Sequence, residues 1–252
     1  MKNKMEQLAE LIEQSKNTVF FGGAGVSTES GIPDFRSEAG LYASRNVYGY
    51  PPEELLSHHL FLQEPELFFR YYKENLITLN ARPNAAHIAM AKLEKKWLLN
   101  AVVTQNIDGL HQAAGSKNVF ELHGSNLRQH CMNCGANYDL EYILNPINCR
   151  DGVIPVCNEC EGVVRPDVVL YEESLDDGVV NAAVQAILSA ELLIVGGTSL
   201  AVHPAAGLLR YFHGENLVLI NKSKTPYDDS AQFCINEAIG KVMEEVMNII
   251  GG

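Results

Sequence analysis

The stretch from Phe20 to Arg36 constrains the possible folds more than any other part of the chain. A short apolar run (18–21) leads directly into a glycine-rich turn (22–25), and a dense set of polar side chains follows. Backbone N–H groups at such a turn can approach a phosphate closely, and a helix that begins near Val26 would aim the positive end of its dipole at the same place. The stretch therefore predicts a nucleotide-binding turn in an α/β fold.

The match to the dinucleotide fingerprint G-x-G-x-x-G is partial. Gly23 and Gly25 supply its first two glycines, but Thr28 stands where the third belongs, and Gly31 comes three residues later. Residues 32–37 look like a loop, at the point where a second strand with a ribose-binding acid is expected. Taken alone, the stretch fits a plain strand-to-helix turn as well as a nucleotide site.

Short apolar runs and amphipathic segments alternate along the rest of the chain. The pattern predicts strands at 18–21, 101–104, 119–122, 167–171, 192–195 and 216–220, and helices around Leu8 to Ile12 and at 64–80, 84–96, 177–188, 204–211 and 237–249. With 252 residues, of which 46% are hydrophobic, the chain can bury a large core. We expect a doubly wound, mostly parallel, Rossmann-like sheet with a small inserted domain.

Charge and composition restrict the partners. Nineteen basic residues against 31 acidic ones give a net charge of -12, which repels nucleic-acid phosphates and anionic membranes and favours lysine-bearing peptides. Residues 192–209 carry no charge, but Gly196, Gly197 and Pro204 interrupt them, so we expect a buried strand and a loop rather than a membrane span. The N-terminal residues do not resemble a signal peptide, and we expect a cytoplasmic monomer.

Four of the six cysteines form two Cys-x-x-Cys pairs, Cys131 with Cys134 and Cys157 with Cys160. Their spacing is typical of a four-thiolate zinc ribbon, and disulfides are disfavoured in the cytosol. Four thiolates leave no open coordination position, so the pattern predicts a structural Zn²⁺ site in the insert. Cys149 and Cys234 lie outside the pairs and are interpreted as ordinary thiols.

Unusual polar side chains follow three of the predicted strands: Asp34 and Arg36, then Asn106 and Asp108, then His123. Each has an ordinary explanation by itself, because Asp and Asn cap helices and Arg forms surface ion pairs. The carboxyl ends of parallel strands meet at one edge of a sheet, where ligands bind. Their shared position favours a catalytic site at that edge.

At this point the chain resembles the sirtuin family of NAD-dependent protein lysine deacylases, in the form of a single catalytic core of the bacterial type. The resemblance runs from about Leu8 to Ile250 and rests on residues 22–27, 31–37 and 104–111, His123-Gly124, the paired cysteines, Gly197-Thr198-Ser199 and Pro204-Ala205-Ala206. It implies that the acyl oxygen of an acyl-lysine attacks the ribose of NAD as nicotinamide leaves. The products are then nicotinamide, deacylated lysine and O-acyl-ADP-ribose.

The resemblance also implies residue roles. His123 is the expected general base, a role suited to a side chain whose ordinary pKa is about 6.5, with Asn106 and Asp108 as further catalytic residues. The implied substrate segment is Val168, Val169, Leu170 and Tyr171, and Cys131, Cys134, Cys157 and Cys160 are the implied zinc ligands. The implied NAD contacts are Gly22, Ala24, Gly25, Thr28, Asp34, Phe35, Arg36, Gln105, Asn106, Ile107, Asp108, Gly197, Thr198, Ser199, Asn221 and Ile239.

The expected domain organisation follows from the same resemblance. Residues 1–35, 80–125 and 163–252 form the Rossmann-like NAD-binding domain, 36–79 the helical and loop part of a small domain, and 126–162 its zinc-ribbon part.

Three departures from the pattern of the family stand out. Glu172 replaces a glycine that many relatives carry, Ala238-Ile239 replaces an adenine-contacting pair, and Phe69 and Tyr72 occupy the Tyr-x-x-Arg positions of desuccinylating relatives. Without that phenol and guanidinium we expect an apolar acyl pocket that takes acetyl first and longer chains second.

Three alternatives remain open from the sequence. The same NAD site could serve protein ADP-ribosyl transfer, because another nucleophile can capture the cationic sugar. A Rossmann dehydrogenase with a zinc insert would instead reduce NAD. A zinc-ribbon protein that senses NAD without turnover is the third, although such a sensor has no need of His123 as a base.

Overall fold

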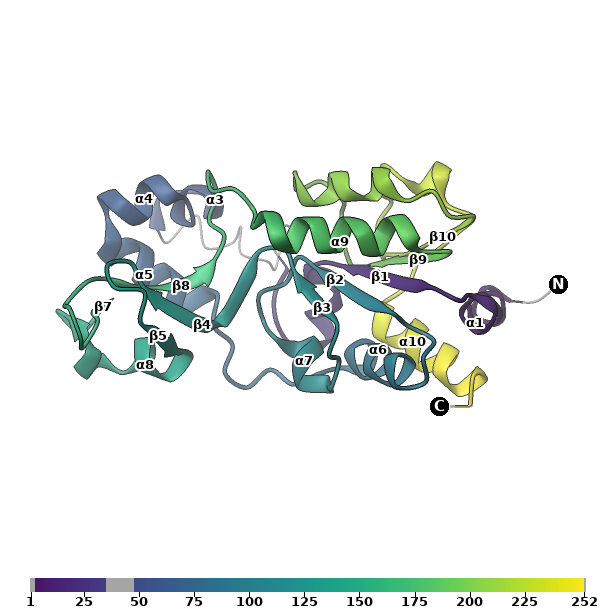
Figure 1. The fold of residues 1–252 in the computed structure, drawn as a ribbon, viewed down its shortest axis with the longest axis horizontal. Helices are drawn as coiled ribbons and strands as arrows, with labels where there is room; N and C mark the ends of the chain where they lie inside the picture. Colours follow the sequence, from purple (N-terminus) through teal and green to yellow (C-terminus); the bar gives the residue numbers. More distant parts are fainter. Residues whose placement is uncertain (1–2, 35–47, 252) are drawn as a thin grey trace.

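The computed structural model describes residues 3–34 and 48–251. A six-stranded sheet runs through one half of the molecule in the order β11-β10-β9-β1-β2-β3, and every neighbouring pair is parallel (Figure 1). Its strands are β1 (Thr18–Gly22), β2 (Ala101–Thr104), β3 (Val119–Glu121), β9 (Leu192–Gly196), β10 (Asn216–Ile220) and β11 (Phe233–Ile235). This is the doubly wound order of dinucleotide-binding folds, with the reversal between β1 and β9. The predicted fold class is confirmed.

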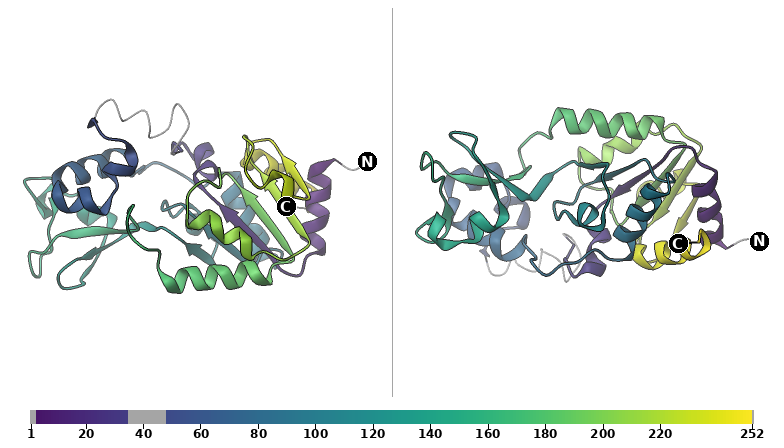
Figure 2. Two further views of the ribbon diagram at one scale, coloured as in Figure 1. Left: turned by 90° about the horizontal axis from the view of Figure 1, so that it is seen from above. Right: turned by 60° about the horizontal axis from the view of Figure 1, so that its bottom comes forward.

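Helices cover both faces of this sheet, as the two turned views also show (Figure 2). One face packs against α1 (Lys4–Gln14), α6 (Ala85–Lys95) and α10 (Ile239–Ile249), and the other against α9 (Asp177–Ser189) and the 3₁₀ helix η5 (Ala205–Tyr211). Successive strand residues point to opposite faces, so Phe20 joins the first core while Val19 and Phe21 join the second. Burial of each such side chain contributes about 1.5–3 kcal/mol to the free energy of unfolding.

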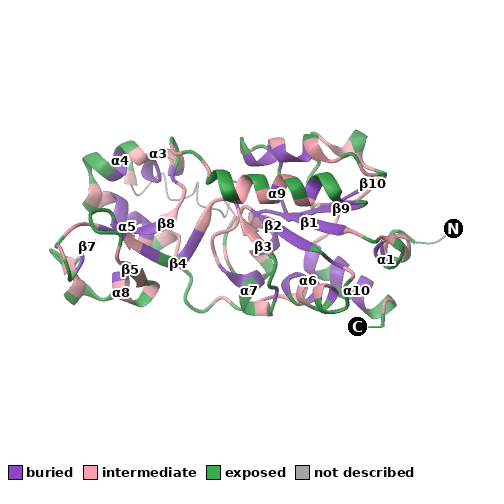
Figure 3. Ribbon diagram, viewed as in Figure 1, coloured by how far each residue is buried: buried purple, intermediate pink, exposed green. Residues whose placement is uncertain are grey.

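The central strands are buried along their whole length, which explains why they are continuous apolar runs rather than alternating ones (Figure 3). Their polar groups therefore come only where each strand ends. The short helix α7 (Leu110–Ala114) and the 3₁₀ turns η1 (Ala24–Val26), η2 (Thr28–Ser30) and η6 (Asp228–Ser230) complete this half. Within the described part of the chain, no helix has the length and apolar character needed to cross a bilayer.

The other half of the molecule is a smaller lobe with its own core. Strand β4 (Gly124–Cys131) pairs antiparallel with both β5 (Asn137–Asp139) and β8 (Val164–Val168), and β6 (Cys149–Arg150) pairs with β7 (Ile154–Pro155). The helical elements of this lobe are α3 (Pro52–Leu55), α4 (His58–Gln63), α5 (Pro65–Asn75), α8 (Leu140–Leu144) and η4 (Pro146–Asn148). Its core is rich in aromatic side chains, among them Phe61, Phe68, Phe69, Tyr71 and Tyr72.

Several predicted elements differ from the structure. The strand expected at 167–171 was predicted to belong to the parallel sheet, but β8 (Val164–Val168) pairs antiparallel with β4, because an apolar run does not reveal its partner. The helix expected at 64–80 ends at Asn75, and the apolar side chains of Leu76 and Ile77 line a cavity instead of continuing the helical stripe. The expected helix near Val26 is only the two 3₁₀ turns η1 and η2, and the helix expected at 204–211 is 3₁₀. The elements that were not predicted are α3, α4, α7, α8, β4, β5, β6, β7 and β11.

Candidate active site

A cavity of about 1350 Å³ lies between the carboxyl edge of the parallel sheet and the smaller lobe. Side chains and backbone from the loops after β1, β2, β9 and β10 line one side, and Leu56, Tyr72 and the chain after α5 line the other. The cavity covers the point where the strand order reverses, between β1 and β9. Ligands of doubly wound sheets bind at this point, because the loops from adjacent strands diverge there.

Two glycine turns meet at the floor of the cavity. The N–H of Gly25 donates to the carbonyl oxygen of Gly197 at 2.8 Å, and a Cβ on Gly25 would lie 2.8 Å from that same oxygen. Gly197 has a φ of +59°, and a Cβ there would lie 2.4 Å from the nitrogen of Val26. Only glycine fits at either position, because the two loops pack backbone against backbone there. Thr28, which breaks the sequence fingerprint, donates its hydroxyl to the carbonyl of Gly25 at 3.0 Å.

A buried hydrogen-bond network connects the loops after β1 and β2. The hydroxyl of Ser27, 1% exposed, donates to Oδ2 of Asp108 at 2.6 Å and accepts from Nδ2 of Asn106 at 3.0 Å. The other carboxylate oxygen of Asp108 accepts from the N–H of Leu110 at 2.9 Å, at the start of α7. Nε2 of His87 lies 3.5 Å from the Ser27 hydroxyl. The network fixes the side chains of Asn106 and Asp108 before any ligand arrives.

His123 lies at the end of β3 and lines the same cavity. Its Nδ1 is 2.9 Å from the carbonyl oxygen of Gln105, and since a carbonyl only accepts, Nδ1 carries the ring proton. Burial lowers the pKa of His123, an effect that this hydrogen bond partly opposes. The ring is therefore neutral near pH 7, and Nε2 is the nitrogen free to accept a proton.

The carboxyl end of β10 and the start of α10 form the far wall of the cavity. Nδ2 of Asn221 donates to the carbonyl of Ser223 at 2.8 Å, and Ile239 is the first residue of α10. The carboxylate of Glu29 accepts from the N–H of Gly240 at 2.7 Å. This bond ties the first turn of α10 to the glycine turn, although 211 positions separate the two residues.

The segment after β8 lies beside His123. The N–H of Val169 donates to the carbonyl of His123 at 3.0 Å, and Val168 to Tyr171 all line the cavity. Glu172 has a φ of +76°, a left-handed backbone conformation that glycine adopts without strain. Its carboxylate accepts from the N–H of His59 at 2.9 Å, which holds the side chain against the start of α4.

Tyr72, Leu76 and Ile77 contribute apolar surface to the cavity on the side of the smaller lobe. The Tyr72 hydroxyl hydrogen-bonds the buried side chain of Asn126 rather than pointing free. Burial raises the pKa of Tyr72 far above its ordinary value, so the hydroxyl stays neutral. Phe69 does not line the cavity and instead packs edge-on against Phe61 and Phe68. No cation from these positions is available to a carboxylate.

The structure brings most of the predicted site residues together, and it also adds some. Gly22 is buried at the end of β1 and does not line the cavity, and Phe35 and Arg36 lie outside the described residues. Sequence reasoning missed Ser27, His87 and Glu29 as members of the site; the signal for His87 was its place at the third position of a helix capped by Asn84. The predicted residues that line the cavity are Ala24, Gly25, Thr28, Asp34, Gln105, Asn106, Ile107, Asp108, His123, Val168, Val169, Leu170, Tyr171, Gly197, Thr198, Ser199, Asn221 and Ile239.

The four paired cysteines converge at the far end of β4. Their sulfur atoms all lie within 4.8 Å of one another, with Cys131 to Cys160 at 3.5 Å and Cys134 to Cys157 at 3.6 Å. Four sulfurs at about 2.3 Å from a tetrahedral Zn²⁺ would be separated by about 3.8 Å, so the cluster fits this ion closely. Cys149 and Cys234 take no part in it.

These features define a nucleotide-binding α/β protein with a structural metal site. They are a doubly wound sheet with a glycine turn where the strand order reverses, a neutral histidine in the same cavity, and a separate cluster of four thiols. Residues 23–204 match the model of the Sir2 family. The chain belongs to this family. Two curated relatives, both named NAD-dependent protein deacetylase, are 56% identical: one from Clostridium acetobutylicum, covering 97% of this chain and 98% of its own, and one from Clostridium perfringens, covering 98% and 100%.

Solved Sir2 structures share the architecture over the whole length. A Sir2 variant with a deacetylated p53 peptide and 3′-O-acetyl ADP ribose superposes with a TM-score of 0.90 at 38% identity, covering 99% of both chains. Sir2 with a p53 peptide and NAD⁺ superposes with a TM-score of 0.86 at 40% identity, again covering 99% of both.

Proposed function

We propose that this protein is an NAD-dependent protein lysine deacetylase, which yields nicotinamide, deacylated lysine and O-acyl-ADP-ribose. The observation that carries the proposal is the position of His123, whose proton is held on Nδ1 by Gln105 while its ring lines the cavity that holds the glycine cradle. The naming of the curated relatives as NAD-dependent protein deacetylases supports the same reaction. A Sir2 structure with an acetylated peptide supports a peptide substrate.

The cavity fits NAD chemically. The closely packed turns at Gly25 and Gly197 both line the cavity, and glycine-rich backbone of this kind suits a diphosphate; the polar loop after β2 lies beside them. NAD supplies the electrophilic ribose carbon. In our proposal Asn106 and Asp108 orient the nicotinamide ribose and carboxamide, and Nε2 of His123 accepts a proton from a ribose hydroxyl. The network through Ser27 holds both side chains in position.

The wider residue assignments belong to the same proposal. The NAD contacts are those predicted from the sequence except Gly22, which does not line the cavity. Phe35 shields the cationic sugar, Asn221 lies at the adenosine ribose, and Val168 to Tyr171 dock the acyl-lysine peptide. We also propose the domain boundaries expected from the sequence, 1–35, 80–125 and 163–252 for the NAD-binding domain and 36–79 and 126–162 for the small domain, with one change: β8 (Val164–Val168) pairs with β4 and belongs to the small domain. Zn²⁺ at the four cysteines is structural, since four thiolates close its coordination sphere.

The acyl preference follows from the apolar surface that the smaller lobe contributes to the cavity. Tyr72 is neutral and engaged with Asn126, and Leu76 and Ile77 are apolar, so an acidic acyl group would lose its hydration without a partner. We propose acetyl as the first substrate and longer apolar acyl chains as further ones. We also propose that the protein is a cytoplasmic monomer. Its net charge of -12 disfavours binding to nucleic acid.

One assay tests the function. The protein is incubated with NAD and an acetyl-lysine peptide, and mass spectrometry follows deacetylated peptide, nicotinamide and acetylated ADP-ribose. All three should appear in equal amounts. Absence of the acetylated product would overturn the deacetylase proposal. ADP-ribosylated protein would then point to transferase activity, reduced NAD to a dehydrogenase and unchanged NAD to a sensor.

A further inference from the structure

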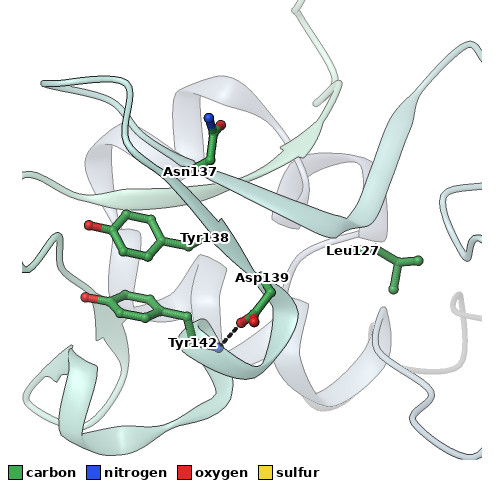
Figure 4. Close-up of a pocket in the computed structure, with 5 residues that line it drawn as sticks. All are labelled: Leu127, Asn137, Tyr138, Asp139 and Tyr142. Atoms are coloured by element: carbon green, nitrogen blue, oxygen red, sulfur yellow. Dashed lines mark hydrogen bonds between the residues drawn. The ribbon is translucent and has the colours of Figure 1, made fainter.

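The thiol cluster has a hydrogen-bond partner outside the four cysteines. The hydroxyl of Tyr138, from β5, lies 3.0 Å from Sγ of Cys157, which is only 1% exposed. The ring of Tyr138 packs against that of Tyr142, with centroids 4.0 Å apart, and Figure 4 shows the two phenols side by side at the wall of a small surface pocket of the lobe. Among the described residues, Tyr138 supplies the one side-chain hydroxyl bonded to a thiol of the cluster.

The direction of this hydrogen bond follows from the metal chemistry. A zinc-bound cysteine is a thiolate without a proton, so its sulfur can only accept, and the phenol must donate. The Tyr138 hydroxyl also lies 2.6 Å from Oδ1 of Asn158, a second acceptor for its single proton. A phenol that donates to the zinc-bound sulfur therefore requires the Asn158 amide to turn, so that its NH₂ group faces the phenol oxygen.

This bond is distinct from the backbone bonds that the cluster also receives. The N–H of Asn133 lies 3.4 Å from Sγ of Cys131, and the N–H of Glu159 lies 3.4 Å from Sγ of Cys157. Such bonds come from the turn of each Cys-x-x-Cys pair, so any chain with this turn makes them. The Tyr138 bond depends on one side chain delivered by β5, and it gives Cys157 a second donor.

We propose that Tyr138 is a positioning residue for the zinc site, whose hydroxyl holds Cys157 on the metal and lowers the negative charge on its sulfur. Four thiolates around one Zn²⁺ carry a net charge of -2, so a donor that withdraws charge from one sulfur stabilises the whole set. A thiolate that shares its charge is also a weaker nucleophile. Partners of metal ligands typically change metal affinity 10- to 100-fold. This inference rests on the zinc site proposed above, and not on the deacetylase reaction.

The chain offers a matched pair of variants. Tyr138→Phe keeps the stacked ring and removes only the hydroxyl at Cys157. Tyr142→Phe removes the neighbouring hydroxyl, which donates to the carbonyl of Val156 at 2.9 Å and touches no thiol of the cluster. Zinc-loaded full-length proteins are titrated with a chromophoric chelator to measure the zinc dissociation constant. We expect Tyr138→Phe to weaken zinc binding 10- to 100-fold and Tyr142→Phe to change it less than threefold.

A second measurement separates the hydrogen bond from packing. With Co²⁺ in place of zinc, the sulfur-to-metal charge-transfer band reports the charge on the thiolates. Loss of a donor raises the energy of the sulfur lone pairs, so Tyr138→Phe should shift the band to longer wavelength and Tyr142→Phe should leave it in place. Equal zinc affinity and equal spectra for both variants and the unaltered protein would overturn the proposal, as would equal losses in both variants. An unaltered protein that binds no zinc would overturn it together with the zinc site, even if the protein deacetylates its peptide.

Discussion

The hydroxyl of Ser27 donates to Oδ2 of Asp108 across 2.6 Å, and 81 positions of sequence separate the two residues. The bond joins the glycine turn after β1 to the polar loop after β2. Because the same hydroxyl accepts from Asn106, one serine sets the orientation of two proposed catalytic side chains. The glycine turn after β1 and the loop that carries the proposed catalytic residues are therefore joined into one unit.

Ser27→Ala should lower kcat/KM for deacetylation about 10- to 100-fold. A hydrogen bond to a charged group contributes about 1.5–3 kcal/mol. Its loss leaves the Asp108 carboxylate held by the N–H of Leu110, and it removes the Ser27 partner of Asn106. Ser30→Ala is the matched control, since its hydroxyl, which also follows β1, accepts from Nδ2 of Asn84 at 3.0 Å and does not contact Asp108. Steady-state kinetics of both variants decide the matter, and equal activities would show that Ser27 does not position the pair.

His123→Ala should keep NAD binding, measured by calorimetry, and lose turnover. In the unaltered enzyme the base must be unprotonated, and burial lowers the pKa of His123 below its ordinary value of about 6.5. Activity should therefore stay constant as the pH falls through 6.5 and decline only below it. A profile of kcat/KM against pH that already halves above pH 6.5 would contradict this assignment.

His111→Phe should reduce the sensitivity of the fold to acid. Burial, and next to it the neighbouring His87, lower the pKa of His111 to about 3, and neither of its ring nitrogens has a partner among the described residues. Because the pKa of His111 is lower in the folded protein, its contribution to stability is complete above the unfolded pKa of about 6.5. As the pH falls below this value, the free energy of unfolding decreases by about 1.4 kcal/mol per pH unit. The free energy of unfolding, measured with denaturant between pH 6.5 and 5, should fall less steeply with pH in His111→Phe than in the unaltered protein.

The control for this experiment is His213→Asn, a change at an exposed histidine. The dependence of its free energy of unfolding on pH should match that of the unaltered protein. At pH 7 the phenyl ring should be tolerated at position 111, because an apolar group replaces a buried polar one that makes no hydrogen bond. A steeper acid limb in His111→Phe would refute the prediction.

Glu29→Ala should raise the dissociation constant of NAD about three- to tenfold and leave kcat at saturating NAD unchanged. The lost bond to the N–H of Gly240 frees the first turn of α10, where Ile239 lines the cavity, and also removes a favourable charge from the helix N-terminus. Glu244→Ala, on an exposed face of the same helix, is the control. Unchanged NAD affinity in Glu29→Ala would exclude this positioning effect.

Cys160→Ser should abolish stoichiometric zinc binding, while Cys149→Ser should retain one zinc per chain, since Cys149 lies outside the cluster. Closed thiolate sites contribute directly to folding, so zinc loss should unfold the smaller lobe and expose its aromatic core. Metal analysis and near-ultraviolet circular dichroism report the two effects. A metal-free protein that stays folded and active would refute a structural zinc.

The sequence by itself determined the features that depend on local pattern. Continuous apolar runs marked β1, β2, β9 and β10, because strands buried on both faces need no polar alternation. The spacing of the cysteine pairs marked the metal cluster, because two tight turns suffice to present four thiols. The convergence of Asn106, Asp108 and His123 followed from the rule that parallel strands end at one edge.

The tertiary structure decided what depends on contacts between distant segments. The polar residues of β4 and the short runs of α3, α4 and β11 carry too little periodicity to mark them, and only their partners make them regular. The antiparallel pairing of β8 could not be read from its apolar run. The contacts of Ser27 with Asp108, Glu29 with Gly240 and Tyr138 with Cys157 join residues far apart in the chain. Hydrogen bonds need their partners within about 3 Å, and only the folded chain brings these groups that close.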